Sequence, residues 1–549
     1  MKKKWSKLLS LALSTVMISM LAVGCTSAPS ENSGDVSNTS DVSSVGDVDN
    51  TVDETKVLNI AVSAELTTLF PLNMDIQNLS ATRLVYEGLV NIEDGEVVPW
   101  LATDWELSNE GKTITFNLRD DVTFHDGEKF NAEAVKKVYE FAGKNPNFGA
   151  QRGVSALTQI DVIDEFTVAF QYEQPYFGYL SDLAYREVMV CPSPLMIEEE
   201  NFQSMKGVVG TGPYVHTEVK DGEYVKFVSN ENYWGEAPYY DEVYVKYIPE
   251  ASARLMALQQ GEVDVIYGNN LNSWDDYEQA IAMDGISGKV ADLNSKTVNV
   301  VVNATDPALS ELAVREALAY GIDKQAICDG LTYGYQEPAV GLFPEGNFLS
   351  DVTMDIVRNF DQEKANNLLD EAGWIMTDSG IREKDGQPLA FQMNYDSGEP
   401  MNKLIATTIK SQLAEIGMNA ETVGQDMMTW WKEGSSGNYG LIIWNTEENT
   451  APQNYYPKMA VATPHGPSLK GIEGGDVFLQ NIEKAQGIAT TEEAKTAYAE
   501  IMNFSNSNVL DLPIAYAREN ILFREDAVAD YTFTSTPMMF EIDNIVPAE

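Results

Sequence analysis

The sequence predicts a mixed α/β (α+β) fold built from more than one domain. Short β-branched runs of strand length alternate with segments whose apolar residues recur at helical spacing, and no fixed-period repeat is present. Beyond an N-terminal segment of different composition, roughly 500 residues remain, which is enough for two or three domain-sized cores. Mixed strands and helices over this length are typical of multidomain α/β or α+β proteins.

Individual segments show the pattern. Val57–Val62 is a β-branched run of strand length, and Thr113–Leu118 alternates as a half-buried strand does, after turn-forming residues at 109–112. Asn131 is a candidate N-cap for a helix that begins with Ala132–Val135. Further helices are expected around residues 313–320, 363–372, 402–416 and 491–504, and further strands at residues 297–302 and 440–444.

Residues 1–24 have the features of a secretory signal peptide. A positive cluster, Lys2–Lys4, precedes the apolar stretch Leu8–Val23, which is too short for a stable membrane span. Residues 21–25, Leu-Ala-Val-Gly-Cys, resemble the bacterial lipobox, although Ala22 stands where leucine is usual. This resemblance implies a diacylglycerol on Cys25. The alternative is an ordinary secretory signal that ends in Gly-Cys.

Residues 25–56 are expected to be the lipidated cysteine and a flexible acidic linker. Ser, Asn, Asp, Val, Thr and Gly dominate this segment, which contains no aromatic residue, so it cannot bury enough apolar surface to offset its ordering entropy. Asp47 and Asp49 lack the glycine turn and distal glutamate of a calcium loop. A solvated linker between a lipid anchor and a folded body is the simpler interpretation.

Charge and cysteine content restrict the partners. The chain has 84 acidic and 36 basic residues and a net charge of −48, whereas nucleic acid binding requires clustered Lys and Arg, so no nucleic acid partner is expected. Of the three cysteines, Cys191 and Cys328 remain beside Cys25. An exported protein permits a disulfide, but a bridge between separate domains would prevent their relative movement. Buried free thiols are therefore expected.

A set of short motifs runs in order along the chain from about Leu58 to the C-terminus. They are LVYEGLV (84–90), VPWLA (98–102), Trp105 with Ser108 and Gly111, TFNLRDDV (115–122), FHDG (124–127), GTGPY (210–214), NENYWG (230–235), VREAL (314–318) and LPI (512–514). Together they resemble the bacterial extracellular solute-binding proteins of family 5, which serve peptide and nickel ABC importers.

The resemblance implies a two-lobed, periplasmic-binding-protein-like fold of the large class C type, which encloses a solute when the lobes close about a hinge. Most motifs then have structural roles: Gly212-Pro213 a turn, Trp234 a packed corner and Arg119 an internal ion pair. Lobe I is expected to comprise residues 57–292 and 512–549, with lobe II at residues 293–511.

Four further segments resemble the nickel-importer branch of this family. They are residues 230–236, 266–269, 311–318 and 381–389. In that branch the metal arrives in a small polycarboxylate chelator, arginines hold the carboxylates and one histidine completes the coordination. These residue types suit a nickel chelate, because guanidinium groups bind carboxylates bidentately and imidazole is a good ligand for nickel.

Three residues match positions of this site by their local order along the chain. Arg152 and Arg186 match the positions of the carboxylate-binding arginines, although either could instead be a surface residue, with Glu187 as a possible partner for Arg186. His465, on a loop flanked by proline and glycine, is either a metal ligand or a solvated loop histidine. Trp444 is expected on the cleft wall. The remaining histidines, His125 and His216, are expected to be structural, in a turn and on a strand face.

The residues after Trp444 depart from the nickel branch. The branch carries an aromatic loop with glycine and aspartate here, whereas residues 445–452 read NTEENTAP. In peptide-binding relatives an acid in this region holds the free amine of the peptide. Glu447 or Glu448 could do so, because a buried amine needs a carboxylate partner. An exposed acidic loop is the alternative, and a di- or oligopeptide is the alternative ligand.

The sequence contains no catalytic signature. Nucleophile-elbow, HExxH, phosphate-loop and dinucleotide motifs are missing, as is a His, Cys and carboxylate cluster for a bare metal ion. The chain is therefore expected to be a non-enzymatic, monomeric lipoprotein on the extracytoplasmic face of the cell membrane. It would bind a Ni(II) chelate as transported ligand, without a permanent cofactor, and deliver it to ABC permease subunits. A secreted hydrolase is a distant alternative.

Overall fold

The computed structural model forms one compact unit over Thr55–Glu549. It describes residues 55–70, 79–93, 95–144, 152–184, 192–198, 205, 207–268, 271–446, 453, 455–456, 464–470, 472–534 and 540–548. Residues 1–54 lie outside these ranges, and so do Arg186, Glu187, Cys191, Glu447 and Glu448. Within them, no helix is long and apolar enough to cross a membrane.

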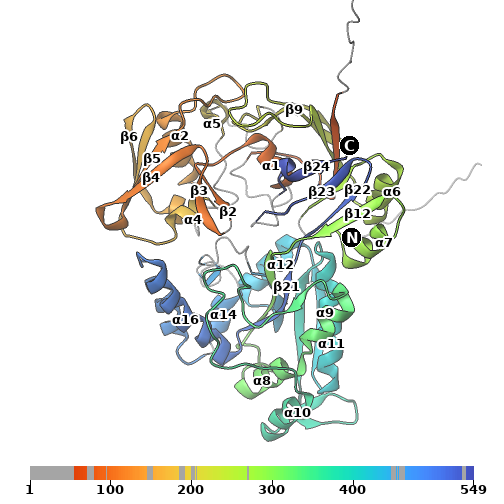
Figure 1. Ribbon diagram of the computed structural model, residues 1–549. Helices are drawn as coiled ribbons and strands as arrows, with labels where there is room; N and C mark the ends of the chain where they lie inside the picture. The colour runs from red at the N-terminus through yellow and green to blue at the C-terminus, as the bar shows by residue number, and fades with distance from the viewer. Residues whose placement is uncertain are drawn as a thin grey trace, which may run out of the picture. The chain divides into compact units, whose positions relative to one another are not determined.

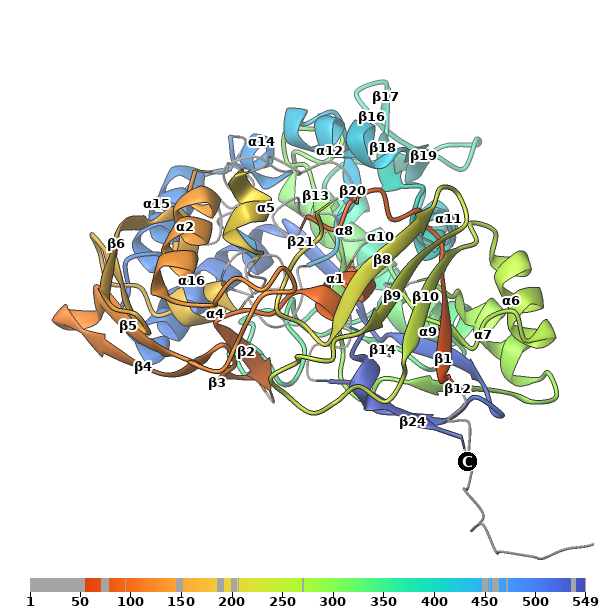
Figure 2. The same cartoon turned by 90° about the horizontal axis from the view of Figure 1, so that it is seen from above.

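A seven-stranded sheet organises the first half of the chain. Its central strand β1 (Val57–Val62) is parallel to β10 and β11, and the other neighbouring pairs are antiparallel. Because successive strand residues face opposite sides of a sheet, Ile60 packs into the large core while Ala61 packs against α6 and α7. Figure 2 shows β8, β9 and β10 side by side. The strand order is β12 (Ile286–Val290), β22 (Asn520–Arg524), β11 (Val265–Ile266), β1, β10 (Glu242–Tyr247), β9 (Tyr224–Ser229) and β8 (Tyr214–Lys220), with α6 at Ala251–Gln260 and α7 at Trp274–Ile281.

A four-stranded antiparallel sheet shares the same core. Its aromatic centre is Phe116 of β5, whose ring lies 5.3 Å from Phe170, and Phe170 in turn lies 5.0 Å from Tyr139 of α2. The expected helix cap is confirmed, because the Asn131 side chain accepts a hydrogen bond from Ala134 N at 3.0 Å. The order is β4 (Ala102–Ser108), β5 (Thr113–Leu118), β7 (Thr167–Tyr172) and β6 (Leu157–Asp164), covered by α2 (Ala132–Ala142).

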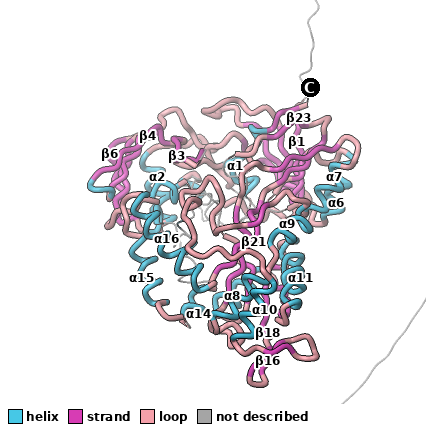
Figure 3. Tube along the Cα trace, turned by 60° about the horizontal axis from the view of Figure 1, so that its bottom comes forward, coloured by secondary structure: helices cyan, strands magenta, loops and turns pink. Residues whose placement is uncertain are grey.

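A six-stranded sheet organises the second half, with helices on both faces (Figure 1, Figure 3). Its strand β13 is buried throughout: Val300 and Val302 contact the α8, α9 and α11 side, and Val301 contacts the α15 and α16 side. The strand order is β14 (Glu337–Pro338), β21 (Asp511–Ala517), β13 (Lys296–Val302), β20 (Leu441–Ile443), β18 (Ala390–Asp396) and β19 (Asn419–Gln425). The helices are α8 (Leu312–Gly321), α9 (Lys324–Thr332), α10 (Gln362–Glu371), α11 (Pro400–Glu415), α12 (Met427–Ser436), α14 (His465–Leu469), α15 (Gly475–Ala485) and α16 (Thr491–Asn508).

The remaining elements are short. They are α1 (Leu79–Val85), α3 (Arg152–Ser155), α4 (Tyr179–Leu183), α5 (Pro194–Glu198), the pairs β2 (Val90–Glu93) with β3 (Glu96–Pro99) and β23 (Val528–Tyr531) with β24 (Ile545–Pro547), and the sheet β15 (Ile375–Met376), β16 (Arg382–Lys384) and β17 (Gln387–Pro388). The strands and helices expected from the sequence are confirmed within a few residues at their ends.

The chain passes between the two large sheets twice, and the two crossings are hydrogen-bonded together. The first joins β12 to β13 across residues 291–295, and the second joins β21 to β22 at residues 518–519. Ser295 N donates to Ala517 O at 2.8 Å, and Ala291 N donates to Glu519 O at 2.9 Å. The second crossing begins only after Ala517, because β21 stays paired with β13 as far as that residue.

Four of the sequence motifs converge on one buried carboxylate, that of Glu87. It accepts hydrogen bonds from four side chains, and burial raises its pKa although those bonds oppose the effect. The donors are Trp100 Nε1 at 3.1 Å, Thr211 Oγ1 at 2.7 Å, Tyr233 OH at 2.9 Å and Trp234 Nε1 at 2.9 Å. The four donors come from three of these motifs, since Tyr233 and Trp234 are neighbours, and Glu87 comes from a fourth, so these motifs serve the fold.

Other structural expectations are confirmed nearby. Arg119 forms the expected ion pair, with Asp121 at 2.8 Å, but the pair lies at the surface, where Asp121 is 53% exposed. Its guanidinium also lies 4.0 Å from the Trp234 ring centre. His125 holds the turn at Gly212 through a 2.9 Å contact between Nε2 and the carbonyl oxygen, and His216 lies on β8. Cys328 is a buried free thiol.

Candidate ligand-binding site

Arg152, the first residue of α3, lies at a contact between the two halves of the chain. Its Nη1 donates to Oε1 of Gln486 at 3.3 Å, and its guanidinium lies 5.3 Å from the ring centre of Tyr176. Its Nε is buried and has no hydrogen-bond partner among the described residues. The arginine therefore keeps one donor that its surroundings do not use.

Asp182 of α4 extends this contact. Its side chain accepts from Gly153 N at 3.1 Å and from Nε2 of Gln453 at 3.2 Å, and it is fully buried. The Tyr498 hydroxyl donates to the Gln453 carbonyl at 3.1 Å. Phe177 N also donates to Ile488 O at 2.8 Å. Polar groups from α3 and α4 thus meet polar groups beside α15 and α16, and Asp182 and Gln453 are buried in this contact.

His465 is not a solvated loop histidine, which was one of its two predicted roles. It is the first residue of α14, not a loop residue, and its side chain is fully buried. The helix is fixed to the end of β13, because Ser468 Oγ accepts from Ala304 N at 2.9 Å and donates to Val302 O at 3.0 Å. The flanking proline and glycine, which suggest a loop in the sequence, instead belong to this short helix and its start.

Asp511 at the start of β21 orients the imidazole of His465. The distance from Nε2 to Oδ1 is 3.1 Å. Burial acts to raise the pKa of Asp511, but His465 and the hydrogen bonds from Ser505 and Asn299 outweigh burial, so the pKa lies below its usual value. Oδ1 also accepts from Tyr455 OH at 2.9 Å and from Asn299 Nδ2 at 2.8 Å. Asp511 is therefore an ionised acceptor at neutral pH.

This pairing determines which nitrogen of His465 is available. An ionised carboxylate only accepts hydrogen bonds, so Nε2 carries the hydrogen, and in the neutral ring Nδ1 holds the lone pair. Nδ1 is buried with no hydrogen-bond partner among the described residues. A carboxylate on one ring nitrogen and a lone pair on the other is the usual arrangement of a histidine that binds a metal.

Trp444 directly follows β20, and its backbone is hydrogen-bonded to strand β13. Its backbone N donates to Asn299 O at 2.8 Å, and its ring stacks on Trp430 at 4.1 Å between centres and contacts Trp431 at 5.0 Å. Trp444 is 7% exposed, whereas Trp431 is 44% exposed. The most solvent-accessible part of this tryptophan cluster is therefore Trp431 of α12. Sequence reasoning missed it, although the tandem Trp430-Trp431 was visible.

A short segment connects these networks. Gln453 contacts Asp182 and Tyr498, while Tyr455, two residues later, contacts Asp511 and Asn299. Arg152, His465 and Trp444 thus belong to adjoining networks. Over the ranges that the structure describes, no three His, Cys, Asp or Glu side chains group closely enough to hold a metal ion.

Comparisons with known proteins agree with this architecture. The chain is 29% identical over 482 residues to the nickel-binding periplasmic protein of Escherichia coli (strain K12), covering 84% of this chain and 90% of that protein. NikA from Brucella suis, solved in complex with Fe(III)-EDTA, matches with a TM-score of 0.85 and 27% identity over 89% of this chain and 99% of that chain. AppA from Bacillus subtilis, solved with a nonapeptide, shares the fold with a TM-score of 0.73 and 20% identity over 90% and 100% of the two chains.

The family profile of the bacterial extracellular solute-binding proteins, family 5 Middle, matches residues 96–467. The mixed α/β structure with its two large sheets is that of the two-lobed periplasmic binding proteins such as NikA and AppA. On these grounds, the chain belongs to the bacterial extracellular solute-binding proteins of family 5.

Proposed function

We propose that this protein is an extracytoplasmic binding lipoprotein that captures a nickel chelate between two lobes and delivers it to the permease of an ABC importer. The lobes would correspond to the parts built on the seven-stranded and six-stranded sheets, with the paired crossings at residues 291–295 and 518–519 as the hinge. The signal peptide, the lipid on Cys25 and the membrane location belong to this proposal. No chemical step is part of it.

The observation that carries the proposal is the buried pair of His465 and Asp511. The carboxylate fixes the ring and leaves Nδ1 without a partner among the described residues. We propose that Nδ1 supplies the protein's ligand to nickel, for which imidazole is a suitable donor. The other coordination positions would come from the chelator, and the lobes would have to open to admit it, since His465 is fully buried.

Arg152 supports the chelate in this proposal. Its unused Nε and its contact with Gln486 place a cation where the two halves of the chain meet. A guanidinium binds a carboxylate through two parallel hydrogen bonds, so Arg152 would bind a carboxylate of the chelator, with Arg186 as the second arginine. The polycarboxylate chelate bound to the Brucella suis relative has this chemistry.

A short peptide is the second candidate ligand. The relative from Bacillus subtilis was solved with a nonapeptide, and Glu447 or Glu448 would receive the free amine of such a ligand. The two candidates differ in the residues that they require: a chelate depends on Arg152 and His465, and a peptide depends on the acidic pair.

Native mass spectrometry combined with metal analysis tests the proposal. The purified protein would be incubated with nickel alone, nickel with histidine, nickel with a tricarboxylate, and a mixture of short peptides. We expect one nickel per chain only when a chelator is present, and loss of nickel in His465→Gln. The matched control, His216→Gln on strand β8, should retain it. Peptide adducts without any nickel chelate adduct would overturn the proposal.

A further inference from the structure

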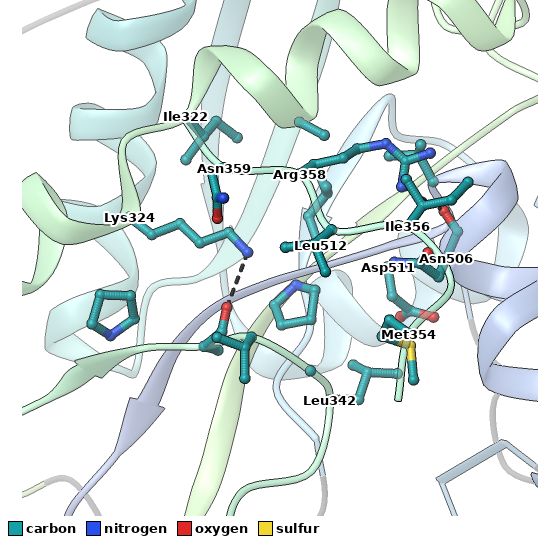
Figure 4. A pocket seen from close by; sticks show the side chains of 18 of the residues that line it. Ile322, Lys324, Leu342, Met354, Ile356, Arg358, Asn359, Asn506, Asp511 and Leu512 are labelled. Atoms are coloured by element: carbon teal, nitrogen blue, oxygen red, sulfur yellow. Dashed lines mark hydrogen bonds between the residues drawn. The ribbon is translucent and has the colours of Figure 1, made fainter. Parts of the chain in front are cut away.

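A cavity of about 390 Å³ lies in the part of the chain built on the six-stranded sheet. It is bordered by the end of α8 and start of α9, the segment after β14, the extended segment before α10, the end of α16 and the start of β21 (Figure 4). This volume is within the range of small-molecule sites. Much of its wall is apolar, formed by Ile322, Leu342, Met354, Ile356, Phe360 and Leu512.

Lys324 brings a charge into this apolar space. Its side chain extends into the cavity, where Nζ donates to the carbonyl oxygen of Ala339 at 3.0 Å (Figure 4). No carboxylate of the described residues forms an ion pair with it. Burial lowers the pKa of Lys324 to about 8, slightly offset by Cys328. An ammonium group in such surroundings is unfavourable unless an anion accompanies it.

The other charged side chains of the wall, Asp323, Arg358 and Asp511, have partners of their own. Asp323 caps α9 by accepting from Ala326 N at 3.0 Å. Arg358, whose side chain is 6% exposed, donates to Glu316 Oε1 and to Asn506 O, both at 3.0 Å, while its Nε has no partner among the described residues. Asp511 is engaged with His465 and its other donors. Figure 4 shows Asp511 and Asn506 across the cavity from Lys324. Among the described residues that border the cavity, Lys324 therefore carries the positive charge that has no ion-pair partner.

We propose that this cavity binds a small monocarboxylate with an aliphatic body, whose carboxylate accepts a hydrogen bond from Lys324 Nζ while the body packs on Leu342, Met354 and Ile356. The arrangement of charges around the cavity favours a monocarboxylate over other classes of ligand. One uncompensated cation matches one carboxylate, a second carboxylate would approach Asp511, and the apolar wall excludes a strongly hydrated ion. The ligand would bind beside β21, in addition to the proposed chelate and independently of Arg152.

Isothermal titration calorimetry of the full-length protein at pH 7 with hexanoate and with hexanamide, its neutral analogue, tests the proposal. We expect saturable binding of hexanoate, at least tenfold weaker binding of hexanamide, and at least tenfold weaker hexanoate binding in Lys324→Met. The matched control Lys129→Met, an exposed lysine paired with Glu165, should bind hexanoate as the wild type does.

The proposal is overturned if the wild-type protein does not bind hexanoate at millimolar concentration, or if Lys324→Met binds it normally. Circular dichroism of Lys324→Met establishes that the variant is folded. A second variant, Leu342→Phe, narrows the cavity without removing the charge and should weaken hexanoate at least tenfold while acetate is less affected; equal hexanoate affinity would also contradict the site. Retained hexanoate binding in Arg152→Ala separates this site from the proposed chelate site.

Discussion

Nε2 of His465 lies 3.1 Å from Oδ1 of Asp511, although the two residues are 46 positions apart and both are buried. Removing this carboxylate leaves the buried donors on His465, Tyr455 and Asn299 without an acceptor, and each unsatisfied donor costs about 1–3 kcal/mol. We therefore expect Asp511→Ala to lower the free energy of unfolding by about 3 kcal/mol or more, measured by urea denaturation. Asp526→Ala, at an exposed ion pair with Arg524, should change it by less than about 1 kcal/mol.

The same carboxylate should produce an acid-sensitive component of stability. The pKa of Asp511 lies below its usual value in the folded protein. Its contribution is therefore complete above the unfolded pKa near 4 and is lost as the pH falls through the folded pKa. Unfolding midpoints measured from pH 6 to pH 3 should fall more steeply in the wild type than in Asp511→Asn; parallel curves would contradict the assignment.

Glu87 should show the opposite dependence on pH. Burial raises its pKa in the folded protein, so stability should decrease as the pH rises from about 4.5 through that raised value. In Glu87→Gln this slope should disappear, and the loss of acceptors for the surrounding donors should cost about 2 kcal/mol at neutral pH. The comparison is with Glu106→Gln on an exposed position of β4, which should retain both the slope and the stability.

Arg152→Ala tests the carboxylate contact of the proposed chelate. A charge-assisted hydrogen bond contributes about 1.5–3 kcal/mol, so nickel chelate affinity should fall by roughly ten- to a hundredfold. Calorimetry with nickel and histidine measures this directly. Arg119→Ala, which removes an ion pair next to Trp234, should leave the affinity unchanged. Equal losses in both variants would show a general structural effect instead.

Lys324→Met should stabilise the ligand-free protein at pH 7. The variant removes a desolvated ammonium group whose pKa is lowered to about 8, a gain on the order of 1–3 kcal/mol. Because the folded state binds fewer protons than the unfolded state above that pH, the difference between variant and wild type should shrink from about pH 8 to about pH 10.5. Urea denaturation at pH 7 and pH 10 measures both values.

The helices and strands could be predicted from the sequence, because alternation, turn and capping preferences act between residues that are close in the chain. The β-branched run at 57–62, the alternation at 113–118 and the Asn131 cap each became the expected strand or helix. The family motifs also predicted the fold. Their common role emerged only in the structure, where residues from 87 to 234 meet around the Glu87 carboxylate.

The candidate site was less predictable, since it depends on long-range contacts. His465 was expected on a loop, yet its burial follows from Ser468 binding the end of β13 and from Asp511 far along the chain. The contact of Arg152 with Gln486 spans 334 positions. Lys324 gave no sequence signal at all, because the cavity around it is assembled from several separate segments.

A thermal-shift comparison tests the nickel chelate proposal most directly. Melting temperatures would be measured for the wild type, Arg152→Ala and His465→Gln with nickel alone, with nickel plus histidine or a polycarboxylate, and with mixed short peptides, because a ligand that binds the folded state raises its melting temperature. We predict stabilisation of the wild type by nickel with a chelator, and a smaller shift in both variants. Stabilisation by peptides with no shift from any nickel chelate would contradict the proposal and direct attention to Glu447 and Glu448.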